Sequence, residues 1–204
     1  MTKGGVVGSG DDRIAEHLVV LRAQLGDSDA FGILFDRYHA RVLAYVEHRM
    51  GSAADAEDVL QEVWVSVVRK IARLEEPQAF RAWLFRVAHR QTISKLRRTR
   101  REVTLDGEAM ERELAGLVAP DDDHATAFAD FESEALHRAL AELSAPHREV
   151  LSLRYFEEFT YEEIAGIVGC GVGTVRSRLY YAKAALHREL ISRAVSHPHN
   201  GDDR

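Results

Sequence analysis

The chain has 204 residues, 46% of them hydrophobic, with four prolines and a formal net charge of −6, so it can form one large domain or two small ones. Its single cysteine, Cys170, excludes an intramolecular disulfide framework and a Cys-rich zinc module. The first 25 residues contain no apolar core of signal-peptide length. The sequence also contains no uninterrupted apolar run of about 18 residues, the length of a membrane span, so we expect a cytoplasmic protein.

The first hundred residues are predicted to be helical throughout. After a Gly-rich start, a first helix runs from Asp12 to Leu25 and ends at Gly26, which closes an N-terminal extension, 1–26. Asp27 or Ser28 can cap the next helix, which ends near Gly51. Ser52 caps a third helix, whose apolar stripe we expect to be buried: Val59, Leu60, Val63, Trp64, Val67, Val68 and Ile71.

The third helix also has a polar face, formed by Asp55, Asp58, Gln61 and Glu62. Acidic residues in a first turn are favoured by the helix dipole, which alone would explain Asp55 and Glu57. Gln61 and Glu62 lie too far along the helix for that explanation. They are therefore candidate contact residues for a partner.

A strongly basic helix follows the loop Leu74 to Gln78. Between Arg81 and Arg101 there are eight Lys or Arg residues and no acid. Spacing places three arginines in a narrow arc flanked by Trp83: Arg86, Arg90 and Arg97. Cations beside the aromatic residues Phe80, Trp83 and Phe85 suit unstacked nucleic-acid bases, although a solvated basic face is the alternative and Trp83 could equally be a core residue.

The sequence becomes acidic after this helix. Glu102 to Glu134 contains eleven acids and one basic residue, Arg112. With its glycines and the break at Pro120, the segment 102–130 is predicted to be a flexible linker. The basic helix can therefore neutralise phosphates, whereas the acidic segment that follows it repels them.

The second half is predicted to contain a helix-turn-helix. Helices are expected at Ala135 to Leu143 and, after a Ser144 cap, at Pro146 to Tyr155. Thr160 and Glu163 then form a capping box, and Gly169 marks a sharp turn. In the next helix, helical spacing places one set of residues on the inner side: Val175, Leu179, Ala182 and Leu186. Another set faces outward: Arg176, Ser177, Tyr180 and Tyr181. An outward cationic set can bind DNA, whereas an ordinary helical hairpin is the simpler alternative.

The tail 194–204 contains His197 and His199, and we assign no metal site there.

Four runs of sequence together resemble bacterial sigma-70 family RNA polymerase sigma factors of the extracytoplasmic-function class. They are DAEDVLQEVW at Asp55 to Trp64, AWLFRVA at Ala82 to Ala88, LRR at Leu96 to Arg98 and YEEIAGIVGCGVGTVRSRL at Tyr161 to Leu179. The resemblance implies an all-α fold of two small helical domains joined by the acidic linker, which would pass through the polymerase's RNA channel. Sigma domain 2 would occupy 27–101 and sigma domain 4 would occupy 131–193.

The resemblance also implies roles for particular residues, and it implies no catalytic residue and no cofactor. The core-polymerase contacts would be Asp55, Asp58, Gln61 and Glu62. The contacts to the minus-10 promoter element would be Leu74, Trp83, Arg86, Arg90, Arg97 and Arg98. The contacts to the minus-35 element would be Thr174, Arg176, Ser177, Arg178, Tyr180 and Lys183. The implied partners are the clamp and flap of core RNA polymerase, promoter DNA and an anti-sigma factor.

Two other classes of protein share some of these features. A response regulator with a similar DNA-binding domain should begin with alternating strands and helices, which the first hundred residues do not suggest. An enzyme could use His39, His48 or His89, but none of them has metal-ligand spacing such as HExxH, and no glycine-rich phosphate loop precedes a helix.

Overall fold

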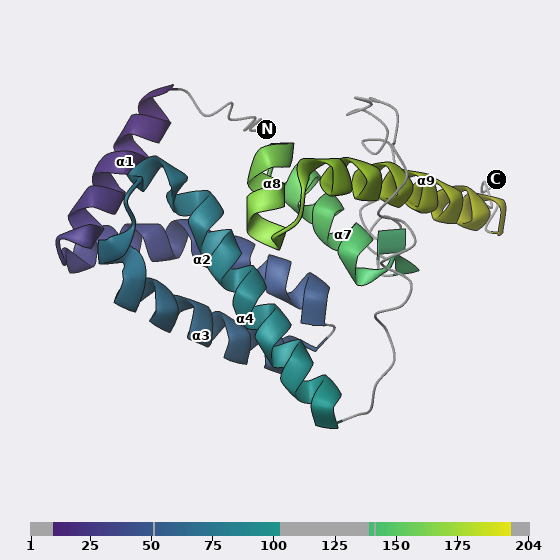
Figure 1. Ribbon diagram of the computed structural model, residues 1–204, viewed down its shortest axis with the longest axis horizontal. Coiled ribbons are helices and arrows are strands. Elements are labelled where there is room, and N and C mark those ends of the chain that lie inside the picture. The colour runs from purple at the N-terminus through teal and green to yellow at the C-terminus, as the bar shows by residue number, and fades with distance from the viewer. Residues whose placement is uncertain (1–9, 51, 103–138, 141, 197–204) are drawn as a thin grey trace, which may run out of the picture. The chain divides into compact units, whose positions relative to one another are not determined.

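The computed structural model describes residues 10–50, 52–102, 139–140 and 142–196, and every regular element among them is helical (Figure 1). The chain divides into two compact units, Met1–Val103 and Thr104–Arg204. The predicted all-α fold with two helical domains is confirmed. Most of the predicted linker 102–130 and the tail from 197 onward lie outside the described residues, so the predicted domain boundaries stay predictions.

The first unit contains α1 (Gly10–Gln24), α2 (Ser28–Met50), α3 (Ala53–Lys70) and α4 (Phe80–Glu102). Two short 3-10 turns, Ile71–Arg73 and Pro77–Ala79, connect α3 to α4. The helix α2 packs against α1, α3 and α4, and α3 packs against α4. The unit is therefore built around α2 and the seam between α3 and α4.

Sequence signals explain where these helices begin. Gly26 adopts a left-handed conformation with φ +88° after α1, which is favourable for glycine. The Asp27 carboxylate accepts hydrogen bonds from the backbone N–H groups of Asp29 and Ala30, and Ser52 accepts one from Asp55 N. The bond from Ala30 N and the neighbouring Arg22 lower the pKa of Asp27. The predicted caps of α2 and α3 are confirmed.

Aromatic pairs join α2 to α4 in the core of this unit. The Tyr38 and Phe80 rings meet edge to face at 5.7 Å, as do Tyr45 and Phe85 at 5.4 Å. Tyr38 is buried, and its hydroxyl donates to Glu16 Oε1 over 2.8 Å. Burial, together with that carboxylate, raises the pKa of Tyr38 well above its usual range. These contacts fix the start of α4 against α2.

The predicted buried stripe of α3 is correct except at one position. Val59, Val63 and Val67 are fully buried, but the Val68 side chain is 58% exposed. Val68 follows Leu60 and Trp64 at intervals of four residues on the same face of α3, but it lines an open apolar groove instead of packing against another helix. Val68 therefore belongs to the surface of α3.

The second unit contains α7 (Ala145–Leu151), α8 (Tyr161–Val168) and α9 (Val172–Ser196), and α9 packs against both α7 and α8. Residues 139, 140 and 142 are also helical. The expected inward set of α9 is confirmed, since each member is at most 2% exposed: Val175, Leu179, Ala182 and Leu186.

One expectation around α7 was wrong, and the predicted helix from Pro146 to Tyr155 consists of two types of helical turn. Ser144 occupies the N-cap position but its side chain makes no capping hydrogen bond, and Pro146 stands in the first turn, where a missing N–H costs nothing. The α-helix ends at Leu151 rather than Tyr155 and continues as a π-helical turn, Ser152–Phe156. In this wider turn, Glu157 N donates a hydrogen bond to Ser152 O. The side chains of Leu153 and Phe159 are both buried.

The capping box of α8 is confirmed. Thr160 N donates to Glu163 Oε2 over 2.8 Å, and Glu163 N donates to Thr160 Oγ1 over 3.2 Å. Gly169 ends α8 in the left-handed conformation, with φ +73°. The chain then turns directly into α9, so α8 and α9 form the predicted helix-turn-helix.

Candidate nucleic-acid interface

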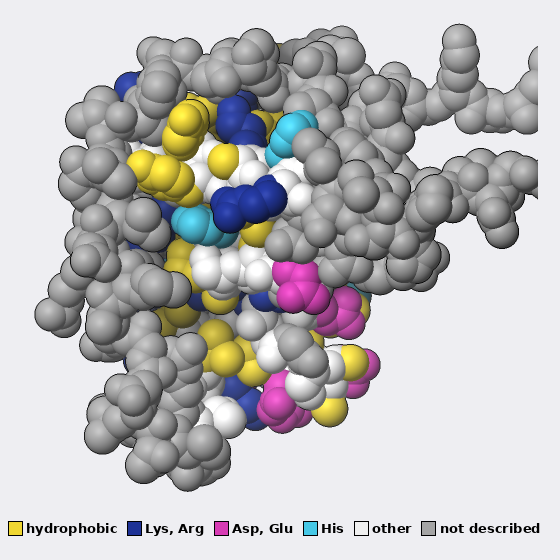
Figure 2. Space-filling view, turned by 90° about the vertical axis from the view of Figure 1, so that its right-hand side faces the viewer, with side chains coloured by type: hydrophobic (Ala, Val, Ile, Leu, Met, Phe, Trp, Pro, Cys, Tyr) yellow, Lys and Arg dark blue, Asp and Glu magenta, His cyan; other side chains and the backbone are white. Residues whose placement is uncertain are grey.

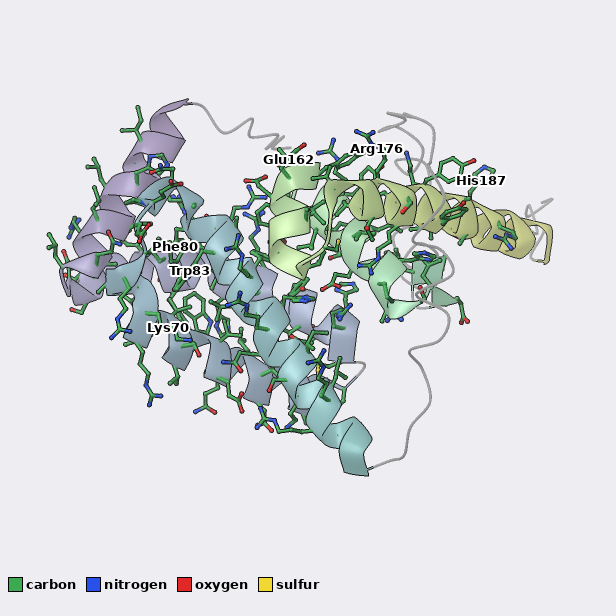
Figure 3. All side chains as sticks on the ribbon, in the orientation of Figure 1. Lys70, Phe80, Trp83, Glu162, Arg176 and His187 are labelled. Carbon is green, nitrogen blue, oxygen red and sulfur yellow. The ribbon has the colours of Figure 1, made fainter. Side chains whose placement is uncertain are left out.

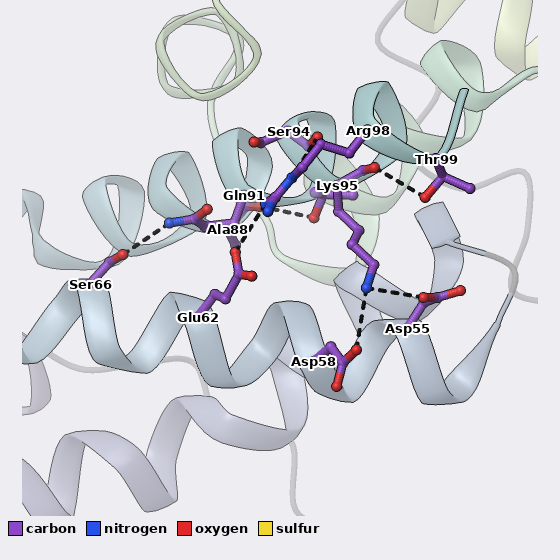
Figure 4. Close-up of polar contacts among 11 residues, drawn as sticks. Asp55, Asp58, Glu62, Ser66, Ala88, Gln91, Ser94, Lys95, Arg98 and Thr99 are labelled. Atoms are coloured by element: carbon purple, nitrogen blue, oxygen red, sulfur yellow. Dashed lines mark hydrogen bonds and ion pairs between the residues drawn. The ribbon is translucent and has the colours of Figure 1, made fainter. Parts of the chain in front are cut away.

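The acidic face of α3 lies opposite cations of α4 (Figure 4). Lys95 Nζ is 3.2 Å from both Asp55 Oδ1 and Asp58 Oδ2. Its hydrogen bonds, first to Asp58 and then to Asp55, raise the pKa of Lys95. Asp58 keeps 68% of its side chain exposed, so this pairing still leaves it accessible to a partner.

A second ion pair crosses the same seam. Arg98 Nη2 lies 3.4 Å from Glu62 Oε2, and one turn further along, Gln91 Nε2 donates to Ser66 Oγ over 2.9 Å (Figure 4). Glu62 was predicted to contact polymerase and Arg98 to contact DNA. The structure brings these two residues into contact with each other.

Arginines of α4 also line a groove of about 360 Å³. Its lining residues are His89, Arg90, Ile93, Ser94, Arg97 and Arg98. Arg90 and Arg97 are exposed, as their predicted arc requires. Arg86 is half-buried and not part of the lining, and its Nε atom is buried without a hydrogen bond among the described residues. We call this groove, with the six lining residues named above, the basic groove. Figure 2 shows Lys or Arg side chains beside His and hydrophobic side chains on one face of the molecule.

The predicted aromatic platform is reduced to one residue. Phe80 and Phe85 are 0% exposed because they pack against Tyr38 and Tyr45, so they cannot stack on bases. Trp83 is half-buried, with its ring centroid 6.0 Å from that of Phe80 (Figure 3). Trp83 is the aromatic residue of the three that retains an accessible surface.

The loop before α4 is held in place by α1. Gln24 Nε2 donates to Ile71 O over 3.0 Å and to Leu74 O over 2.6 Å. The Leu74 side chain is half-buried. This tether fixes the loop that carries Leu74, and the sequence contained no signal for it, since Gln24 lies 50 residues away.

An apolar groove of about 550 Å³ lies beside the acidic face of α3. Gln61 lines it together with side chains of α2 and α3 that include Phe35, Trp64, Val65 and Val68. Phe35 and Trp64 pack with ring centroids 4.8 Å apart. Sequence reasoning missed this groove because it assigned Val68 to the core.

The helix-turn-helix presents a partly cationic surface on α9. Arg176 is exposed, and Figure 3 labels its position on α9. Tyr180 is 37% exposed and meets Tyr181 edge to face at 5.3 Å. Thr174, Arg178 and Lys183 are half-buried.

The outward placement of Ser177 was wrong. Ser177 is only 4% exposed, and its hydroxyl donates to Thr174 O over 3.1 Å. A small side chain that bonds its own helix backbone fits on the packed side of α9, so Ser177 cannot reach a base edge.

Arg178 lies close to a histidine of α7. Burial of His147 lowers its pKa, and the positive charge of Arg178 lowers it further. The positive charge of Arg178 therefore acts on His147 of α7 and is also part of the cationic surface of α9.

The described residues contain no group of three or more His, Cys, Asp or Glu side chains that could hold a metal ion. Among those same residues, no helix combines the length and apolar character needed to cross a membrane.

Comparison with known proteins gives the family. Residues 34–102 match Sigma-70 region 2, and residues 133–186 match Sigma-70, region 4. The RNA polymerase sigma-H factor of Pseudomonas aeruginosa is 33% identical over 181 residues, which cover 84% of this chain and 92% of that protein. The chain belongs to the extracytoplasmic-function class of the sigma-70 family.

Other relatives agree with this assignment. The ECF RNA polymerase sigma factor SigW of Bacillus subtilis is 28% identical over 84% of this chain and 94% of its own. The sigma factor RpoE from Bartonella quintana, solved in complex with the anti-sigma factor NepR, matches with a TM-score of 0.61 at 25% identity, over 79% of this chain and 96% of RpoE. CnrH, solved with the cytosolic domain of CnrY, shares the fold at 24% identity and a TM-score of 0.60.

This sigma factor is a transcription initiation factor, and the response-regulator alternative is not favoured. The region 2 match contains the acidic face of α3 and the basic groove, and the region 4 match contains the helix-turn-helix up to Leu186. The helix α1, with the Gln24 tether, lies outside both matches.

Proposed function

We propose that this sigma factor binds core RNA polymerase through α3, opens promoter DNA at the minus-10 element through α4, and reads the minus-35 element through α9. The observation that carries the proposal is the presence of arginine-bearing surfaces in each of two separate units, one matching region 2 and one matching region 4. No catalytic step is proposed, and the factor would act in the cytoplasm.

The polymerase contact is assigned to Asp55, Asp58, Gln61 and Glu62, facing the clamp of the largest subunit. Support comes from the exposure of Asp58 and from the position of Gln61 in the lining of the apolar groove. Carboxylates beside an apolar groove suit a partner helix that carries cations and hydrophobic side chains. The second unit would contact the polymerase flap.

Gln61→Lys should weaken this docking, because a cation would replace a neutral side chain on an acidic surface that faces a cationic partner. A pull-down with core polymerase measures the loss. Gln78→Lys, the same substitution at an exposed residue of the loop before α4, is the control. Equal retention of the two variants would contradict docking through α3.

The minus-10 contact is assigned to the basic groove, with Arg90, Arg97 and Arg98, together with Arg86, Trp83 and Leu74. Exposed arginines can follow the phosphates of a displaced strand while a partly exposed tryptophan stacks on a base. Phe80 and Phe85 have no part in this contact.

Replacing Arg86, Arg90 and Arg97 by Ala should reduce strand opening, because three cations near the displaced strand would be lost. Permanganate reactivity of unpaired thymines in a promoter complex with core polymerase measures the opening. Arg37→Ala, an exposed arginine of α2, is the control and should leave reactivity unchanged. Undiminished reactivity in the triple variant at moderate salt would remove α4 from strand opening.

The minus-35 contact is assigned to α9, where Arg176 and Tyr180 would reach base edges and Thr174, Arg178 and Lys183 would contact phosphates. An anti-sigma factor is a further proposed partner. That proposal is supported by the likeness to Bartonella quintana RpoE, which was solved with such a factor.

A further inference from the structure

Arg98 belongs to two surfaces at once. It lines the basic groove with Arg90 and Arg97, yet its guanidinium is turned toward α3, where Nη2 lies 3.4 Å from Glu62 Oε2 (Figure 4). Its Nε atom lies 3.5 Å from Ser94 O. The Arg98 side chain is 58% exposed and that of Glu62 is 44% exposed, so water and ions reach the pair.

Lys95, the neighbouring cation, is held differently. Its ammonium contacts two carboxylates at 3.2 Å, its side chain is only 24% exposed, and it is not part of the groove lining. Arg98 has one longer contact to a single carboxylate. A single exposed ion pair is weak and exchanges readily, so Arg98 is the cation of this seam that can change partners.

We propose that Glu62 is a positioning residue for Arg98: it holds the guanidinium against α3 in the free chain and competes with DNA phosphates for it. This inference rests on the proposed role of the basic groove. Glu62 thereby lowers the affinity of the groove for single-stranded DNA. Because Glu62 also lies on the proposed polymerase surface, a polymerase cation that pairs with Glu62 would release Arg98 to the DNA.

The expected effect follows from the strength of exposed ion pairs. Removing the competitor should raise the affinity of the free chain for single-stranded DNA about two- to fivefold. The gain should disappear at high salt, because salt screens both the ion pair and the phosphate contact.

The test is fluorescence anisotropy of the full chain with a short, fluorescein-labelled single-stranded oligonucleotide of mixed sequence at low salt. Glu62→Gln is compared with Asp58→Asn, which makes the same charge change on the same helix but faces Lys95 instead of Arg98. We expect the larger gain from Glu62→Gln. Adding Arg98→Gln to Glu62→Gln should abolish that gain.

Equal gains from Glu62→Gln and Asp58→Asn would overturn the inference, because they would reflect overall charge alone. A gain that survives in the Glu62→Gln/Arg98→Gln double variant would overturn it as well. Arg90→Ala tests the groove separately: if it leaves binding unchanged, or if no variant binds at low salt, the proposed role of the groove fails too.

Discussion

At the scale of single residues, α9 places neighbouring side chains in very different surroundings. Arg176 is exposed, whereas Ser177 is 4% exposed and bonded to its own helix. Lys183 lies two turns further along and is half-buried. Because a recognition helix reaches base edges mainly through its first turns, Arg176 can read bases and Lys183 is better placed for the DNA backbone.

Arg176→Ala should therefore flatten base preference at particular positions of the minus-35 element. A bidentate arginine contact discriminates between bases by about 1 to 3 kcal/mol. Lys183→Ala should weaken binding to all sequences nearly alike and reduce its salt dependence. Both variants are compared with the wild type, as holoenzyme, on a randomised minus-35 library. An unchanged position-specific profile for Arg176→Ala would reassign Arg176 to the backbone.

At the scale of elements, the N-cap positions of α7 and α8 differ. Thr160 shares a reciprocal capping box with Glu163, so it satisfies a backbone donor of α8. Ser144 precedes α7 in the same position but makes no side-chain bond. The two sites form a matched pair for measuring what a cap contributes.

Thr160→Ala should lower the free energy of unfolding of the second unit by about 1 kcal/mol, because the N–H of Glu163 loses its acceptor. Ser144→Ala should leave that free energy nearly unchanged. Urea denaturation followed by circular dichroism measures both. A comparable loss in the two variants would show that the cap geometry does not decide the stability of α8.

Local signals in the sequence predicted the elements well but not their contacts. The caps at Asp27, Ser52 and Thr160 depend on residues within three positions, so they could be predicted. The π-helical turn after Leu151 and the exposure of Val68 depend on which faces pack together. The same holds for the candidate site: helical spacing predicted the arc of Arg90 and Arg97, but the Arg98–Glu62 pair joins residues 36 apart and required the packing of α3 on α4.

At the scale of the whole molecule, charge is divided along the chain. The net charge is −6, yet Arg81 to Arg101 contains eight cations and no acid. The basic groove lies in the first unit, and the exposed Arg176 of α9 lies in the second. An acidic chain with two cationic surfaces suits a protein that meets DNA on a polymerase rather than alone.

The central claim is tested most directly by transcription in vitro with purified core polymerase and a randomised promoter library. We expect transcripts that require this sigma factor and that start downstream of two shared sequence elements, one for each unit. The core preparation is first shown to be active with another sigma factor. If that competent core then produced no transcripts dependent on this chain, the account of it as a promoter-recognising initiation factor would be contradicted.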